Sequence, residues 1–233
     1  MDTAQNIINR WQEVRREIDR AARGCGRDPE EITLVAVSKT YPAQDVRILA
    51  QAGHLDFGEN YVQEALDKVD ELSDCPIRWH FIGRLQTNKA KFLPGRFALI
   101  HSLDRLKTAH ILDQRCAPKG LVQPVLLQVN LGGEKQKGGI EADDLMEAAR
   151  DIDSLPGIDV QGLMCMPPFF DDPEKARPFF SRLAHLRDEL QNGLGKKLRQ
   201  LSMGMSGDYQ AAIEEGATLL RIGTSIFGPR NSG

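Results

Sequence analysis

Lys39 is the residue whose type and position most clearly suggest chemistry. It ends the segment 32–39, in which every residue from 32 to 37 except Thr33 is apolar. Such a run is typical of a parallel strand buried on both faces. Active groups of α/β folds gather just outside the carboxyl ends of these strands, where loss of water favours the neutral form of an amine. The position predicts a nucleophile toward an aldehyde, although a solvated lysine closing a strand is the simpler interpretation.

Two later segments combine glycines and hydroxyl groups in a way that suits phosphate binding. They are residues 202–208 and 221–225, and the residues concerned are Ser202, Gly204, Ser206, Gly223, Thr224 and Ser225. Free backbone N–H groups ahead of a helix attract anions, and the loops after the last two strands of a barrel often bind phosphate. Ordinary helix capping and a tight turn are the alternative interpretation. An amine facing two phosphate loops describes a site for pyridoxal 5′-phosphate, with Lys39 as its Schiff-base lysine.

Alternating strands and helices must position these groups. Hydrophobic patterns and turn residues predict strands at 32–39, 54–58, 78–82, 97–101, 124–130, 158–164, 198–202 and 218–222. They predict helices at 3–23, 42–52, 59–72, 87–92, 103–116, 142–152, 173–191 and 209–215. About eight such units indicate an α/β fold of the (β/α)8 TIM-barrel type, formed as one domain over residues 1–233. The segment after Ile222 is too short for a full last helix, so we expect the N-terminal helix to fill that place.

Composition narrows the class of protein. The chain has 233 residues, 41% hydrophobic and 27% charged, with a formal net charge of -3, which gives no electrostatic case for nucleic acid. No apolar stretch approaches the roughly 20 residues that cross a bilayer, and the N-terminus does not resemble a signal peptide. The four cysteines are scattered, as expected of free thiols in a reducing compartment. We expect a cytoplasmic monomer that binds neither membrane nor nucleic acid.

Other motifs fail on inspection. Asp208 stands where a G-x-S-x-G nucleophile elbow needs its final glycine, and Gly139 stands where a P-loop needs lysine. The five histidines lack H-E-x-x-H spacing, so no metal site is expected. His80 and His101 could face the mouth of the barrel, although histidines packed beside a core are the commoner case. Cys165 and the methionines around it are expected to pack.

A series of motifs runs through the chain in a fixed order. They are Leu34-Val35-Ala36-Val37-Ser38-Lys39, Phe57-Gly58-Glu59-Asn60-Tyr61 and onward to 64, Trp79-His80-Phe81-Ile82-Gly83-Arg84 and onward to 89, Gly162-Leu163-Met164, Leu201-Ser202-Met203-Gly204-Met205-Ser206, and Arg221-Ile222-Gly223-Thr224-Ser225 and onward to 228. With them the sequence resembles, nearly end to end, the pyridoxal phosphate homeostasis protein family, also called the YggS or proline synthetase co-transcribed family.

The resemblance implies a barrel similar to the N-terminal domain of alanine racemase, with the cofactor held as an aldimine on Lys39. It further implies that Arg221 faces the pyridine nitrogen. The phosphate is expected on Ser206, Gly223 and Thr224 with help from Ser202, and the remaining pocket residues are expected to be Asn60, Met203 and Gly204. One departure is visible: Gly132 replaces a serine of the family pattern Asn-x-Ser-x-Glu-x-x-Lys-x-Gly, and a secondary role for Lys137 stays open.

The family implies a binding protein that holds pyridoxal 5′-phosphate for vitamin B6 homeostasis, affects amino-acid metabolism indirectly, and delivers the cofactor to apo-enzymes. The alternative is an amino-acid racemase or decarboxylase. Racemases of the similar fold draw a tyrosine base from a second domain of the partner subunit, and this chain has only Tyr41, Tyr61 and Tyr209. We therefore expect a carrier rather than an enzyme.

Overall fold

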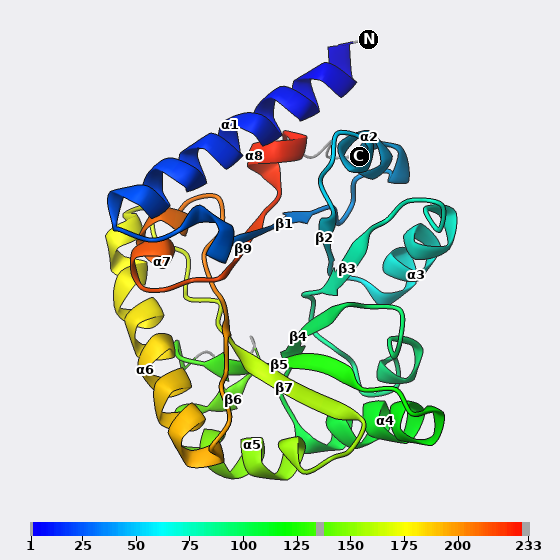
Figure 1. Ribbon diagram of the computed structural model, residues 1–233, viewed down its shortest axis with the longest axis vertical. Helices are drawn as coiled ribbons and strands as arrows, with labels where there is room; N and C mark the ends of the chain where they lie inside the picture. Colours follow the sequence, from blue (N-terminus) through cyan, green and yellow to red (C-terminus); the bar gives the residue numbers. More distant parts are fainter. Residues whose placement is uncertain (1, 134–137, 230–233) are drawn as a thin grey trace.

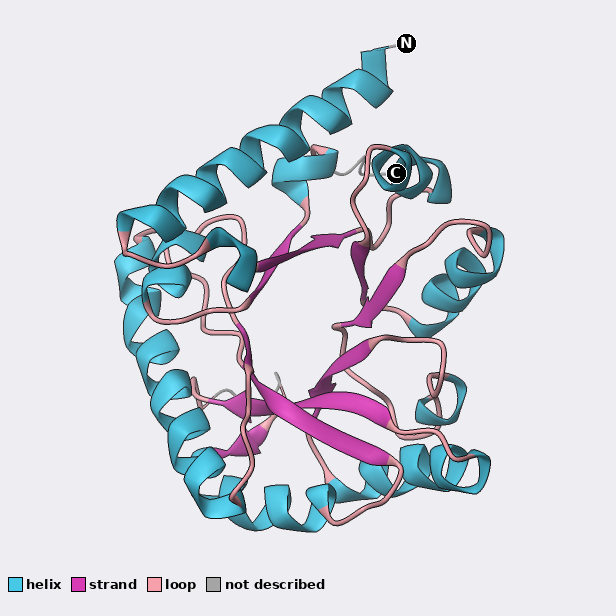
Figure 2. Cartoon of the chain, in the orientation of Figure 1, coloured by secondary structure: helices cyan, strands magenta, loops and turns pink. Residues whose placement is uncertain are grey.

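Eight parallel strands close into a barrel in the computed structural model, which describes residues 2–133 and 138–229 (Figures 1 and 2). Pairing of the first strand with the last, and of the fourth with the fifth, completes the ring. The strands are β1 (Thr33–Val37), β2 (Asp56–Glu59), β3 (Arg78–Phe81), β4 (Leu99–Leu103), β5 (Gln123–Asn130), β7 (Ile158–Met164), β8 (Gln200–Ser202) and β9 (Leu219–Ile222). The predicted α/β barrel is confirmed.

Helices form the outer ring around the strands (Figure 2). They are α1 (Asp2–Gly24), α2 (Ala43–Gln51), α3 (Val62–Glu71), α4 (Leu106–Cys116), α5 (Leu145–Asp153), α6 (Arg177–Leu194), α7 (Tyr209–Glu214) and α8 (Thr224–Phe227). The last of these has only four residues, and α1 lies across it and also contacts α2 and α7 (Figure 1). Arg10 of α1 donates hydrogen bonds to the carbonyls of Ile226 and Phe227. The N-terminal helix therefore takes the place of a full last helix, as predicted.

The sequence prediction was wrong in three places. The helix expected at 87–92 is only a 3-10 turn, Ala90–Phe92, because Pro94 and Gly95 stop the chain after a single turn. The two-residue strand β6 (Ile140–Glu141), which pairs with β5, and the short α8 were not predicted, since neither is long enough to show a period. Most other boundaries shift by one to a few residues. Lys137 lies outside the described residues.

Two apolar regions stabilise the barrel. The larger lies between the strands and the surrounding helices and includes Phe57, Phe81 and Phe180, all fully buried. The smaller consists of one residue from each of five strands: Val35, Leu99, Leu126, Met164 and Leu219. Neighbours of these five along each strand belong to the larger region, so side-chain alternation places the five inside the barrel. No helix in the described ranges is both long and apolar enough to span a bilayer.

Candidate functional site

Lys39 lines a cavity of about 310 Å³ at the carboxyl ends of the strands, called here the Lys39 pocket. Six of the predicted site residues border it, drawn from the ends of β1, β2, β8 and β9. They are Lys39, Asn60, Ser206, Arg221, Gly223 and Thr224. The rest of the wall is mostly apolar and comes largely from the loop after β7 and the end of β3, namely Val37, Ile82, Met166, Pro168, Phe169, Phe170, Pro173, Ala176, Met205, Gly207 and Asp208.

The chain turns sharply just after Lys39. Thr40 has a φ of 68°, a left-handed conformation that a β-branched side chain rarely adopts. Its backbone N–H donates to the Glu64 carboxylate at 2.6 Å, which holds the turn in place. Backbone strain of this kind persists where surrounding contacts fix it, and it is common next to binding sites.

A buried ion pair supports the same turn from below. Lys68 of α3 donates to Glu59 Oε1 at 2.7 Å, to Glu64 Oε1 at 2.8 Å and to the Ser38 carbonyl at 2.7 Å, while Ser38 Oγ donates to Glu59 Oε1. Burial raises the pKa of Glu59, and the charge and hydrogen bond of Lys68 oppose that rise. Sequence analysis missed this network, although Glu64 and Lys68 stand four residues apart on one helix, the spacing of a helical ion pair. The network fixes the residues on both sides of Lys39.

Arg221 brings a buried cation to the Lys39 pocket. It is only 4% exposed, and its guanidinium donates to Ser202 Oγ at 2.5 Å and to the Cys165 carbonyl at 2.9 Å. Burial lowers its pKa, yet an arginine begins so far above neutrality that it stays charged. Burial also raises the pKa of the Cys165 thiol to about 12, so that thiol is neutral and packs, as predicted.

The two predicted phosphate loops meet at this pocket. Gly223 stands just before α8 and lies close to β1. A Cβ atom added to it would lie 3.1 Å from the Val37 carbonyl oxygen. In the other loop the Asp208 carboxylate accepts the Met205 N–H at 2.6 Å. This bond closes the turn ahead of α7, and Ser206 within that turn borders the cavity.

A buried acceptor lies at the edge of the pocket. No described residue donates a hydrogen bond to Asn60 Oδ1, and Asn60 borders the Lys39 pocket. A buried acceptor without a hydrogen bond destabilises a fold by about 1–3 kcal/mol. A ligand that donates a hydrogen bond to Asn60 Oδ1 would remove this cost and bind more tightly.

Three predicted site residues lie behind the wall rather than on it. Met203 is fully buried in the outer core, and Gly204 has a φ of 91° with its Cβ direction blocked 2.7 Å away by Ala212. Ser202 is fully buried and reaches the pocket only through its bond with Arg221. The apolar residues after β7 line the pocket but were not predicted as site residues. The run of prolines and phenylalanines at 167–170 was the one sequence feature that could have indicated them.

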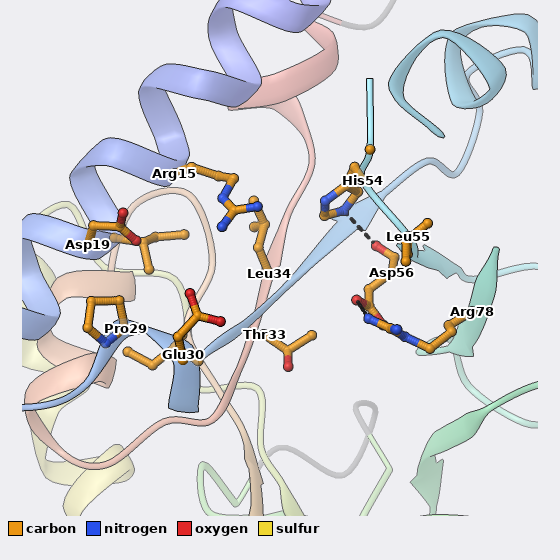
Figure 3. A pocket seen from close by; sticks show the side chains of 13 residues that line it. Arg15, Asp19, Pro29, Glu30, Thr33, Leu34, His54, Leu55, Asp56 and Arg78 are labelled. Atoms are coloured by element: carbon orange, nitrogen blue, oxygen red, sulfur yellow. Dashed lines mark hydrogen bonds and ion pairs between the residues drawn. The ribbon is translucent and has the colours of Figure 1, made fainter. Parts of the chain in front are cut away.

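A second cavity lies at the opposite end of the barrel (Figure 3). It measures about 280 Å³ and borders the first residues of β1, β2 and β3. Its charged lining residues are Arg15, Asp19, Glu30, Asp56 and Arg78. None of the predicted site residues borders this far cavity. Across the described part of the chain, no group of three or more histidine, cysteine or acidic side chains could hold a metal ion.

Comparisons with known proteins agree on one family. The model of the alanine racemase N-terminal domain matches residues 10–231. The pyridoxal phosphate homeostasis protein of Aquifex aeolicus is 46% identical over 225 residues, 97% of this chain and 99% of that protein. The structure of PipY from Synechococcus elongatus PCC7942 with PLP bound superposes with a TM-score of 0.81 at 36% identity, over 91% of this chain and 99% of PipY.

Alanine racemase itself shares the fold at low identity. The Clostridium difficile enzyme superposes with a TM-score of 0.74 at 13% identity, covering 98% of this chain and 57% of the enzyme. A likeness at that identity concerns the barrel alone. The homeostasis proteins match at much higher identity and over their whole length. The chain therefore belongs to the pyridoxal phosphate homeostasis protein family, within the alanine racemase N-terminal domain fold.

Proposed function

We propose that this protein binds pyridoxal 5′-phosphate through Lys39 and serves cytoplasmic pyridoxal phosphate homeostasis as a carrier. The main observation in support is that one cavity is bordered by a lysine amine, a buried arginine and two loops that carry hydroxyl groups. The amine can react with an aldehyde, while the arginine and the loops suit a pyridine ring and its phosphate. The names of the relatives, and the PLP-bound structure of PipY, support the same ligand.

Each group has a place on the ligand. Lys39 would attach to the aldehyde carbon, and Ser206, Gly223 and Thr224 would hold the phosphate. The close approach of Gly223 to β1 leaves no room for a side chain at that position, and Asn60 Oδ1, which no described residue pairs, offers an acceptor to the ligand. The residues present therefore fit the cofactor.

Arg221 would favour binding of the cofactor over catalysis with it. When bound, pyridoxal phosphate supplies an aldehyde and an electron-withdrawing ring, and the ring withdraws most strongly when its nitrogen carries a proton. A permanent guanidinium charge beside that nitrogen disfavours the proton. Arg221 would thus favour tethering of the cofactor over amino-acid chemistry.

Among the described residues, no tyrosine that could serve as the second base of a racemase lines the pocket. Tyr41 donates its hydroxyl to the Gly228 carbonyl and stacks on Phe227, and Tyr209 donates to Glu17. Tyr61 is 57% exposed and borders a neighbouring surface hollow. Among the described residues, neither a tyrosine nor a histidine lines the Lys39 pocket, which supports a carrier rather than a racemase or decarboxylase.

Replacement of the tether tests the proposal directly. Lys39→Ala should abolish the visible absorbance that the cofactor acquires on the wild-type protein, and borohydride should no longer fix a cofactor mass on the chain. Lys107→Ala, a change at an exposed lysine of α4, is the matched control and should behave as wild type. Equal trapping by Lys39→Ala and wild type would contradict the assignment.

A turnover assay separates the carrier from an enzyme. With the cofactor loaded, L-amino acids and their enantiomers should not be converted at about 1 per second, a rate ordinary for enzymes. Transfer of cofactor to an apo-enzyme, followed by recovery of that enzyme's activity, tests delivery. Sustained racemisation at enzyme rates would replace the carrier by a catalyst.

A further inference from the structure

An unbroken chain of hydrogen bonds crosses the inside of the barrel from the Lys39 pocket to the far cavity. Arg221 donates to Ser202 Oγ at 2.5 Å, and Ser202 Oγ lies 2.8 Å from Nδ1 of His101. Nε2 of His101 lies 2.9 Å from Nδ1 of His80, whose Nε2 lies 3.0 Å from Asp56 Oδ1. The five side chains come from β9, β8, β4, β3 and β2.

Strand alternation places this chain inside the barrel. Arg221 stands two residues from Leu219, and His101 stands two residues from Leu99, so each shares the inward face with a member of the inner apolar group. His101 and Ser202 are 0% and His80 is 5% exposed. Such groups cannot turn to bulk water for a partner, so each depends on its neighbour in the chain.

The two ends of the chain carry opposite charges. Arg221 is a permanent cation at one end. At the other, burial alone would raise the pKa of Asp56, but hydrogen bonds from His80 and Arg78 lower it well below its usual value. Asp56 is thus an ionised carboxylate that can only accept. Arg78 donates to both of its oxygens and borders the far cavity (Figure 3).

With both rings neutral, these ends permit one order of donors. Because Asp56 only accepts, Nε2 of His80 must carry the proton and its Nδ1 must accept from His101. Nδ1 of His101 must then accept the Ser202 hydroxyl proton, which leaves the Ser202 lone pairs to Arg221. Burial, helped by the charge of Arg221, holds the pKa of His101 well below its ordinary value, so this ring stays neutral as the order requires. Both nitrogens of each histidine ring and the Ser202 hydroxyl are then paired.

We propose that Asp56, His80, His101 and Ser202 are positioning residues that hold the Arg221 guanidinium toward the Lys39 pocket in one fixed direction. The proposal rests on the proposed function, because Arg221 acts there on the bound cofactor. Charge at the far end of the barrel fixes the proton positions along the chain, and these decide how strongly Ser202 accepts from Arg221. A side chain beyond any contact with the cofactor thereby sets the environment of its ring.

The proton order is measured first, by long-range 15N–1H NMR of the histidine rings near neutral pH, with and without pyridoxal 5′-phosphate. His80 and His101 should both appear as neutral rings protonated at Nε2, with His80→Gln and His101→Gln used to assign the signals. A proton on Nδ1 of His101, or a doubly protonated ring, would overturn the proposal. This measurement needs no cofactor, so it stands even where cofactor binding itself fails.

Asp56→Leu then removes the carboxylate that sets the order. Nδ1–H forms of His80 and His101 should appear, affinity for pyridoxal 5′-phosphate should fall about tenfold, and the visible maximum of the bound cofactor should move. Asp159→Leu is the matched control, since Asp159 is likewise a paired carboxylate near the start of a strand, bonded to Lys196 outside the chain. The control should keep the wild-type maximum, affinity and ring forms.

Ser202→Ala serves as a second variant that removes a single oxygen atom and therefore keeps the fold. It should leave both rings protonated at Nε2, because Asp56 still sets their order, but it removes an acceptor of Arg221 and should shift the visible maximum. Wild-type ring forms in Asp56→Leu, or a wild-type visible maximum in both variants, would overturn the proposal. Failure of the proposed function would show differently, as wild-type protein that takes up no cofactor while the predicted ring forms persist.

Discussion

The two apolar regions of this barrel differ in what they leave room for. Between strands and helices the core is continuous and hydrophobic, with Phe57, Phe81 and Leu112 fully buried. Inside the ring, five apolar side chains of the described residues form a cluster, and a chain of hydrogen-bonded polar side chains runs beside them. Barrels usually fill this space with layers of branched side chains. We therefore expect the packing outside the ring to provide most of the stability, and the polar chain inside it to serve the pocket.

The largest expected effect concerns the outer region. Leu112→Ala should lower the free energy of unfolding by about 2–5 kcal/mol, because it leaves a cavity in a fully packed layer. The affinity of the folded protein for pyridoxal 5′-phosphate should stay unchanged. Denaturant melts combined with a binding titration check both halves. An equal loss of affinity would contradict the separation of the two regions.

A histidine within the outer region provides the next test. Burial lowers the pKa of His54 from 6.5 to about 4, so the unfolded chain binds a proton more readily than the folded one between these values. Stability should be full above pH 6.5 and fall by roughly 2–3 kcal/mol as the pH drops toward 4. Urea melts across this window measure the slope, and His54→Gln should flatten it. A wild-type slope in His54→Gln would assign the effect elsewhere.

Pocket hydroxyls should show the reverse pattern from Leu112. Thr224→Val removes one hydroxyl from the exposed rim and should weaken cofactor affinity by about tenfold, as expected for a bond to a charged phosphate, with little change in unfolding. Ser206→Ala should act similarly. Calorimetric titration gives both affinities, and Ser181→Ala on α6 is a control outside the pocket. Unchanged affinity in both Thr224→Val and Ser206→Ala would contradict the assignment of the phosphate to these loops.

The smallest effect is expected on the outer surface. Arg177 pairs with Glu174, Glu214 and Glu215, but its side chain is 30% exposed and two of the three acids are more exposed still. Arg177→Gln should cost under about 1 kcal/mol, and the difference should shrink in high salt. A loss comparable with that of Leu112→Ala would mean that surface charge rivals the apolar layer.

Sequence patterns were sufficient for the ring and for six residues of the pocket wall, whereas most of the apolar wall was not predicted. Lys39, Arg221, Gly223 and Thr224 follow directly from strand ends, which a barrel brings to one mouth. Met203 and Gly204 were expected on the wall but lie behind it, because Met203 packs in the outer core and the Cβ direction of Gly204 meets Ala212 of α7. These assignments as ligand contacts stay predictions.

The supporting networks could not be read from the sequence. The His80–His101 contact depends on which residues of β3 and β4 stand side by side, and the Ser202–Arg221 contact depends likewise on β8 and β9. Register between neighbouring strands is set by three-dimensional packing and leaves no periodic trace in a single chain. The Glu59–Lys68 pair similarly joins a strand to a helix, so its two halves looked like ordinary charged residues.

The contact between α1 and α8 affects the order in which the molecule folds. Arg10 binds carbonyls 216 and 217 positions away, and β1 finds its second neighbour only in β9. Contacts that span most of a chain slow folding, because a long loop must close before they form. Until β9 is made, β1 keeps an open edge and α1 has no α8 to lie against. We therefore expect the barrel to close late in folding. The chain should be most prone to aggregation in the interval before β9 pairs with β1.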